Sequence, residues 1–116
     1  MAYVPARGDI IHLEFDPASG REMKGPHFAL VLSGEAFNRH GLAMVCPISP
    51  GAAVVARSYG TVVSLMGAGT QTQGAVYCHQ LKSLDWRERR ARCKESVPGY
   101  LVDEVLARIE ALLFDE

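Results

Sequence analysis

Short apolar stretches, separated by turn residues, make up most of the first two thirds of the chain. Residues 8–15 alternate in part, with Ile11, Leu13 and Phe15 on one side, which is typical of a half-buried strand. Residues 28–33 contain a continuous apolar run and indicate a buried strand. Stretches of the same kind predict further strands at residues 42–48, 61–65, 75–79 and, after a bend, 80–84.

Three places interrupt this strand pattern. Pro47 lies within the third stretch and predicts a strand end, an edge or a bulge, because proline donates no ladder hydrogen bond. Residues 35–38 fit a short helix that Gly41 would end. Residues 52–60 stay ambiguous, since they are alanine-rich but short and bounded by glycines.

A helical period is clear only near the C-terminus. Apolar residues recur there at spacings of three and four, which predicts a helix with one face on the sheet. Asp85 and Glu88 also resemble a capping box, so we expect a short helix through residues 87–94. The apolar stripe of the terminal helix consists of Leu101, Val102, Val105, Leu106, Ile109, Leu112 and Leu113.

These elements predict a mainly β fold with a C-terminal helix, as a small bent antiparallel sheet or partial barrel. With 116 residues, the chain is expected to form a single domain over residues 1–116. Its apolar runs are too short to span a membrane, and its first residues lack an apolar export segment, so we expect a cytoplasmic protein.

Composition adds two expectations about chemistry. The three cysteines, Cys46, Cys78 and Cys93, are isolated and are interpreted as reduced thiols. The four histidines have no metal-like spacing, so neither a metal ion nor another cofactor is expected.

Charge is distributed unevenly although the formal net charge is only −1. The run RERRARCK, residues 87–94, holds five cations and one acid, whereas residues 95–116 hold six acids and Arg108. The basic run has two interpretations, a solvated helix face or a patch that meets phosphates or an acidic partner.

The loop predicted at residues 16–27 carries the most chemistry. Arg21, Glu22, Lys24 and His27 bring a carboxylate, two cations and an imidazole within seven residues. Such a set can perform acid–base chemistry on a phosphate, and it can equally be a solvated loop.

Several motifs occur in an order that resembles the MazF/PemK (Kid-like) toxins of type II toxin–antitoxin systems. The resemblance covers nearly the whole chain. It is carried by Gly8-Asp9-Ile10, Phe15-Asp16-Pro17-Ala18-Ser19-Gly20-Arg21-Glu22, Gly25, Ala29-Leu30-Val31-Leu32-Ser33, Ala36-Phe37-Asn38, Cys46-Pro47-Ile48-Ser49, Gly74-Ala75-Val76 and Gln80-Leu81-Lys82-Ser83-Leu84-Asp85.

This resemblance implies an SH3-like small barrel of the CcdB/MazF/PemK type that acts as a homodimer. It implies a ribosome-independent endoribonuclease that cuts single-stranded RNA at short sequences without a metal. It also implies a cognate, MazE-like antitoxin whose C-terminal segment covers the RNA site.

The family's catalytic pattern carries over in part. Glu22 matches its acidic residue, and Ser49 keeps a hydroxyl where the family has a threonine. His27 stands in place of the family's catalytic arginine, and Tyr77 and His79 replace an arginine and an aspartate of the PemK branch.

Metal-free cleavage uses the 2′-hydroxyl of the RNA itself, and leaves a 2′,3′-cyclic phosphate and a 5′-hydroxyl. We therefore expect His27 to be general acid or base, Glu22 to be a partner base or to orient His27, and Ser49 to donate a hydrogen bond to the phosphate. Arg21 and Lys24 would stabilise negative charge. The RNA contacts expected from the resemblance are Arg21, Lys24, Phe28, Tyr77, His79 and Gln80.

Two other functions stay open. A non-catalytic toxin of the same fold binds a protein target, as relatives that poison DNA gyrase do. A degenerate member binds only its antitoxin. The acid–base set at Glu22 and His27 favours cleavage, because a binding toxin does not need it.

Overall fold

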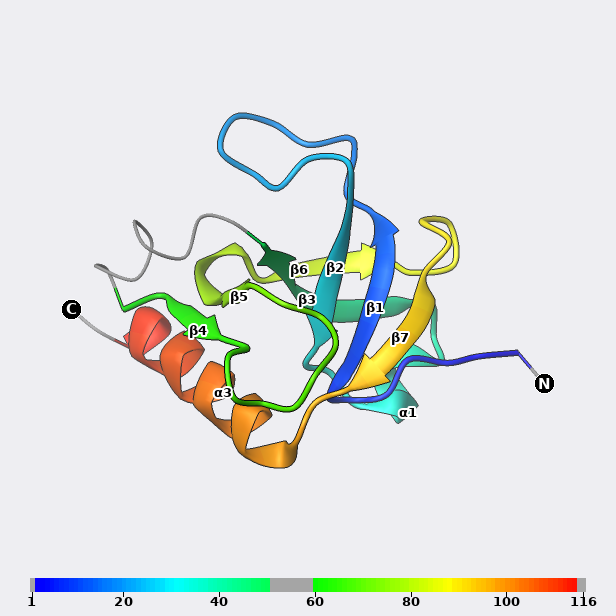
Figure 1. The fold of residues 1–116 in the computed structure, drawn as a ribbon. Helices are drawn as coiled ribbons and strands as arrows, with labels where there is room; N and C mark the ends of the chain where they lie inside the picture. Colours follow the sequence, from blue (N-terminus) through cyan, green and yellow to red (C-terminus); the bar gives the residue numbers. More distant parts are fainter. Residues whose placement is uncertain (1, 51–59, 115–116) are drawn as a thin grey trace.

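The computed structural model describes residues 2–50 and 60–114 and shows a strongly bent antiparallel sheet with one long helix against it (Figure 1). The predicted class, mainly β with a C-terminal helix, is confirmed. The ambiguous segment at residues 52–60 lies, up to residue 59, outside the described residues. The elements are β1 (Asp9–Glu14), β2 (Pro26–Val31), α1 (Glu35–Asn38), β3 (Leu42–Ser49), β4 (Val62–Ser64), β5 (Ala75–Tyr77), the 3-10 helix η1 (Cys78–Gln80), β6 (Lys82–Asp85), β7 (Arg92–Ser96) and α3 (Gly99–Phe114).

The strands of the described residues follow the order β4-β5-β3-β2-β1-β7. Strand β3 is the organising strand, because it pairs with β2 along one edge and with two strands along the other. Its first half, Leu42 to Val45, pairs with β6, and its last residues, Ile48 and Ser49, pair with β5. The sheet therefore divides at the middle of β3.

Pro47 lies at this division, where the predicted strand end or bulge was wrong but the predicted edge holds locally. The residue is inside β3 and lies opposite Ala29 of β2. On the other edge, the pairing with β6 ends at Val45 and the pairing with β5 begins at Ile48. A proline is tolerated because the missing N–H falls where the neighbouring strand changes.

The predicted helix in the basic run was also wrong. Oδ1 of Asp85 does accept the backbone N–H groups of Arg87 (3.1 Å) and Glu88 (3.0 Å), as a helix cap would. The chain nevertheless turns at Arg90, whose φ is 56°, and continues as β7 along the edge of β1. The basic run therefore forms a tight turn and an edge strand.

Two apolar clusters lie on the two faces of the sheet. One joins Ile10, Leu30, Cys46 and Ile48 to α3, and the other joins Ile11, Leu13, Ala29, Val31 and Val45 to Trp86. Neighbouring residues of each strand alternate between them, as the pleat requires. The stripe of α3 is narrower than predicted. Its buried residues are Leu101, Val102, Val105 and Ile109, whereas Leu106, Leu112 and Leu113 are exposed.

Asn38 ties the chain segments around α1 together. Its side chain is fully buried and donates to the carbonyl oxygens of Pro5 (2.8 Å) and Ser33 (3.0 Å). The indole of Trp86 donates to the carbonyl oxygen of Asn38 at 2.8 Å. These bonds join the N-terminal segment, α1 and the turn after β6.

Within the described ranges, no helix is both long enough and apolar enough to cross a membrane.

Candidate active site

The loop between β1 and β2 extends beyond the ends of both strands (Figure 1) and is held by a residue of η1, which lies far from it along the chain. Oε1 of Gln80 accepts the backbone N–H of Met23 at 2.8 Å, and Nε2 of Gln80 donates to the carbonyl oxygen of Arg21 at 3.2 Å. The Met23 side chain packs against the cluster that contains Ala75 and Tyr77. Gln80, predicted as an RNA contact, therefore uses both ends of its amide to position the loop.

Glu22 is presented by this loop on the same side. Its carboxylate accepts the N–H of Ser19 at 2.8 Å and lies 3.8 Å from Nζ of Lys82 in β6. Half of the Glu22 side chain is exposed, so the carboxylate can reach a ligand from solvent. Arg21 and Lys24 are exposed in the same loop.

Lys82 was not among the predicted site residues. It belongs to the stretch Gln80 to Asp85 that carried the resemblance, but only the pairing of β6 with β3 brings it close to the loop.

His27 lies in β2 and not in the loop, where it was predicted. It faces Leu13 across the β1–β2 pair, and its ring meets that of Phe15 edge to face, with centroids 6.4 Å apart. Phe28 lies opposite Ile48 in the antiparallel pair of β2 and β3. Continuing that register by one residue brings His27 opposite Ser49. Ser49 in turn faces Ala75 of β5. Backbone register therefore places His27 and Ser49 in one row on one face.

Phe28 was predicted as an RNA contact beside His27, but it points to the other face. It packs against the cluster that holds Ile10 and Ile48, and its ring meets that of His12 at 4.9 Å. Successive residues of a strand point to opposite faces, so the two side chains leave β2 on different sides, although both border one cavity of about 450 Å³ at this end of the strand.

Tyr77 and His79 form a stacked pair next to the loop. Their ring centroids are 5.1 Å apart and the ring planes differ by 28°. Tyr77 is buried and His79, in η1, is exposed. The pair therefore offers a partly exposed aromatic surface on which an unpaired base can stack.

The cysteines do not add a nucleophile to this face. Burial raises the pKa of the Cys78 thiol to about 11 and also raises the pKa of Cys46, so both stay protonated at neutral pH. Among residues 2–50 and 60–114, no three side chains of His, Cys, Asp or Glu cluster closely enough to hold a metal ion.

The small antiparallel sheet with its terminal helix is the architecture that the sequence motifs implied, that of a compact β-sheet toxin. The family model described as "PemK-like, MazF-like toxin of type II toxin-antitoxin system" matches residues 6–113. The chain therefore belongs to the PemK/MazF toxin family.

Named relatives are similar over most of the chain. "Endoribonuclease PemK" of Escherichia coli is 37% identical over 108 residues, which is 92% of this chain and 80% of the relative. "Endoribonuclease toxin ChpB" of Escherichia coli strain K12 is 38% identical over 108 residues, 92% of each chain. "Endoribonuclease toxin MazF" of that strain is 31% identical over 96% of each chain.

Solved structures agree with the fold. The crystal structure of MazF from Deinococcus radiodurans superposes with a TM-score of 0.87 at 35% identity, over 97% of this chain and 98% of that one. A MazE–MazF crystal structure from the same organism gives a TM-score of 0.82 at 34% identity, over 99% of this chain and 100% of that one.

Gly74 packs closely against the backbone of Ser49 and Pro50. Its φ is +119°, and a Cβ at this position would meet the carbonyl oxygen of Ser49 and lie 2.8 Å from Cα of Pro50. We expect Gly74→Ala to lower the free energy of unfolding by about 2–4 kcal/mol through strain and overpacking, measured by urea denaturation. Gly69→Ala is the matched control, because φ there is also positive (+79°) but nothing lies within 4 Å. Equal losses in both variants would contradict the role of the close contact.

The loop before β5 is held by Glu95. Its carboxylate accepts the N–H of Gln71 (3.0 Å), the N–H of Thr72 (2.7 Å) and the hydroxyl of Thr72 (2.6 Å). The Thr72 hydroxyl contributes most to lowering the pKa of Glu95, and the two backbone N–H groups add to it. The charged carboxylate therefore stabilises the folded state.

We expect Glu95→Gln to lower the free energy of unfolding at pH 7 by about 0.5–1 kcal/mol, because an amide oxygen replaces only part of these bonds. The folded pKa is below the unfolded value of 4.5, so the stabilisation is complete above that pH and is lost as pH falls through the folded pKa. Urea denaturation from pH 7 to pH 3 should show the difference from wild type shrinking. Glu110→Gln, on the exposed side of α3, is the control. A difference that stays constant with pH would contradict this prediction.

Proposed function

We propose that this toxin is a metal-independent endoribonuclease that cuts single-stranded RNA on the face formed by β2, the end of β3 and the β1–β2 loop. The observation that carries the proposal is the strand register. Because Phe28 lies opposite Ile48, the neighbouring residues His27 and Ser49 fall on one face, and Lys82, opposite Val45 on that face, lies 3.8 Å from the Glu22 carboxylate. The family membership and three relatives named as endoribonucleases support it.

The reaction needs three contributions from the protein. A base removes the proton of the 2′-hydroxyl, which attacks the adjacent phosphorus, and an acid protonates the departing 5′-oxygen. Cations or hydrogen-bond donors stabilise the extra negative charge of the transition state. The products are a 2′,3′-cyclic phosphate and a 5′-hydroxyl.

His27 supplies the acid or base, since imidazole is the side chain suited to proton transfer near neutral pH. Ser49 donates a hydrogen bond to the phosphate from the adjoining strand. Glu22 acts as the partner base or orients His27. Its neighbour Lys82 joins Arg21 and Lys24 as a source of positive charge. Arginine in the family serves as a permanently charged clamp, so its replacement by His27 moves charge stabilisation to these cations.

The exposed ring of His79, which stacks on the buried Tyr77, contacts an unpaired base beside the cut. The toxin is further proposed to act in the cytoplasm, where mRNA is available. It is held inactive by a MazE-like antitoxin, in keeping with the MazE–MazF complexes among its structural neighbours.

An exposed apolar patch supports the proposal that the toxin is a homodimer. A cavity of about 360 Å³ is bordered by Phe37, Met44, Leu81 and Leu106, whose exposed fractions are 38–42%. Large apolar side chains grouped in this way on a small protein mark an interaction surface. Leu106 is the residue of the α3 stripe that faces this patch instead of the sheet core.

Cleavage is tested with a long unstructured RNA in EDTA. We expect the wild type to give defined fragments ending in 2′,3′-cyclic phosphates. His27→Ala should slow single-turnover cleavage by about 10²–10⁴, the usual contribution of a general acid or base. Ser49→Ala should slow it by about tenfold or more, since one charge-assisted hydrogen bond is lost. His40→Ala, exposed at the end of α1, is the matched control and should cut like wild type.

Intact RNA over a wide pH range would overturn the proposal and leave a toxin that binds a protein target or only its antitoxin. Cleavage by His27→Ala at the wild-type rate would overturn the role of that residue.

Dimerisation is tested by sedimentation or light scattering. The wild type, with a chain mass of 12.6 kDa, should have twice that mass at micromolar concentration. Met44→Glu should give the single mass, because a charge in the apolar patch must be desolvated on association. Met66→Glu, at a residue that is 90% exposed and lies outside the patch, should remain a dimer. A wild type of 12.6 kDa would contradict the prediction.

A further inference from the structure

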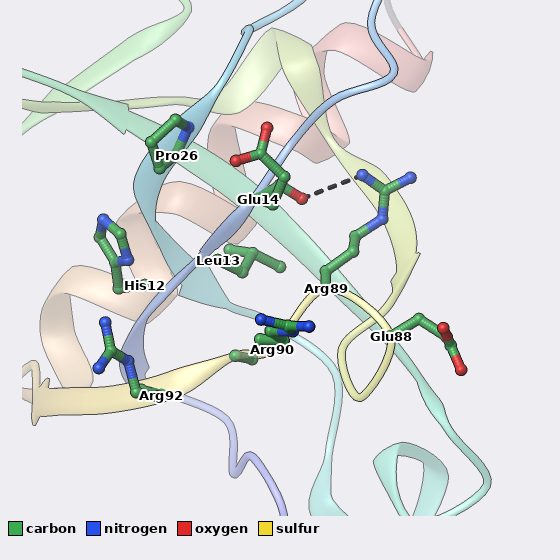
Figure 2. A pocket seen from close by; sticks show the side chains of 9 residues that line it. His12, Leu13, Glu14, Pro26, Glu88, Arg89, Arg90 and Arg92 are labelled. Atoms are coloured by element: carbon green, nitrogen blue, oxygen red, sulfur yellow. Dashed lines mark hydrogen bonds between the residues drawn. The ribbon is translucent and has the colours of Figure 1, made fainter.

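A second groove lies on the side of the sheet to which His12 and Phe28 point, and His27 borders one end of it. Two cavities, of about 730 and 450 Å³, adjoin there, and both are bordered by His12 and Pro26. The larger cavity lies between β1 and the turn that precedes β7 (Figure 2), and the smaller one lies against the loop at Gln71 to Gln73. We call the two together the β1–β7 groove.

Positive charge predominates in the β1–β7 groove. Its four cations are Arg89, Arg90, Arg92 and Lys94, against the two carboxylates of Glu14 and Glu88. In Figure 2, His12 and Arg92 lie next to each other at one end of the larger cavity, in agreement with their cross-strand pairing, whereas Glu88 lies at the other end.

One of the four cations is used for structure. Nη1 of Arg89 donates to the carbonyl oxygens of Glu14 and Asp16, each at 3.0 Å, and so anchors the base of the β1–β2 loop. The side chains of Arg90, Arg92 and Lys94 belong to exposed residues and remain available for a ligand.

Arg90 occupies a backbone conformation that favours glycine. Its φ of 56° is the only positive value at a non-glycine residue in the described part of the chain. A left-handed conformation is unfavourable for an ordinary residue, and glycine would avoid this cost at a tight turn. The arginine side chain at this point therefore suggests a use other than closing the turn.

The smaller cavity adds groups that recognise bases. The rings of His12 and Phe28 meet edge to face at 4.9 Å, and the exposed side chains of Gln71 and Gln73 border the same space. Aromatic rings stack with bases, and amides form hydrogen bonds with base edges. His27 also borders this cavity, so the groove ends at the strand residue that is proposed to perform the cleavage.

We propose that the β1–β7 groove binds the single-stranded RNA that flanks the cut, with phosphates on Arg90, Arg92 and Lys94 and a base beside Phe28 and His12. The inference rests on the proposed function and extends it to a second face of the sheet. An acidic peptide is the other anionic ligand that the charge admits. The combination of stacking rings, amides and spaced cations favours RNA, because a run of carboxylates has no use for the rings and amides.

The test measures binding of a fluorescein-labelled, mixed-sequence 2′-O-methyl RNA 20-mer, which cannot be cleaved because its 2′-oxygens are blocked. The double variant Arg92→Gln/Lys94→Gln should bind about tenfold more weakly than wild type at 0.1 M salt. Its slope of log affinity against log salt should flatten by about 1.4, since each lost phosphate contact removes about 0.7 on a single strand.

The matched control is Arg39→Gln/Arg87→Gln, which removes the same charge near α1, away from the groove. This control should keep the affinity and the salt slope of wild type. Equal losses in the two double variants would overturn the inference, because they would show only an effect of net charge. Wild-type binding by Arg92→Gln/Lys94→Gln would also overturn it.

Arg90→Gly removes a cation of the groove without weakening the fold, so it tests binding and stability separately. Glycine suits the left-handed turn, so the midpoint of thermal unfolding should stay the same or rise, while affinity for the 20-mer falls several-fold. Unchanged affinity in this variant would contradict the inference.

Two further outcomes distinguish the inference from the proposed function. If the wild type cuts RNA but the groove variants bind the 20-mer normally, the groove assignment fails and the nuclease stands. A ten-residue glutamate peptide tests the other ligand. If the peptide binds Arg92→Gln/Lys94→Gln more weakly than wild type, while the 20-mer binds both equally, the groove binds an acidic partner and the RNA assignment fails.

Discussion

The register of β2 between β1 and β3 is the constraint on which the rest of this toxin depends. Pairing Leu13 with His27 and Phe28 with Ile48 decides which side of the sheet each side chain occupies. A shift by one residue would exchange His27 and Phe28 between the two faces. The register is held by the core, because Ala29 and Leu30 are fully buried on opposite sides.

With that register, the two faces of the sheet acquire different chemistry. One face joins His27 and Ser49 to the loop that Gln80 holds, with Glu22 and Lys82 at its edge. The other face is filled by α3 at one end and open at the end where His12 and Phe28 lie. In the account proposed here, RNA is cut on the first face and its flanking part is bound on the second.

Much of this fold was predictable from sequence because its strands and terminal helix carry strong apolar patterns. The order of the motifs also led to the correct family. The basic run was misinterpreted for a physical reason. Edge strand β7 has little apolar character to reveal it, and Asp85 caps a turn with the same bonds that cap a helix. Consequently the groove that β7 borders could not be predicted.

The site was predicted less completely than the fold. Glu22 and Lys24 were placed correctly in the loop, but His27 was assigned to that loop although it lies in a strand. Lys82 was missed, because its nearness to Glu22 does not follow from spacing along the chain. Phe28 was grouped with residues of the opposite face, because the face it occupies also depends on strand pairing. Such relations depend on strand pairing between distant segments. The catalytic roles of His27, Glu22 and Ser49 stay predictions.

The most direct test of the two-face account uses the four histidines as reporters. His27 and His79 lie on the proposed cleaving side, His12 lies in the β1–β7 groove, and His40 lies by α1 away from both. Imidazole NMR spectra recorded while a non-cleavable 2′-O-methyl RNA is added should show signals of His12, His27 and His79 shifting and that of His40 unchanged. An unmoved His27 signal at saturating RNA would contradict the account.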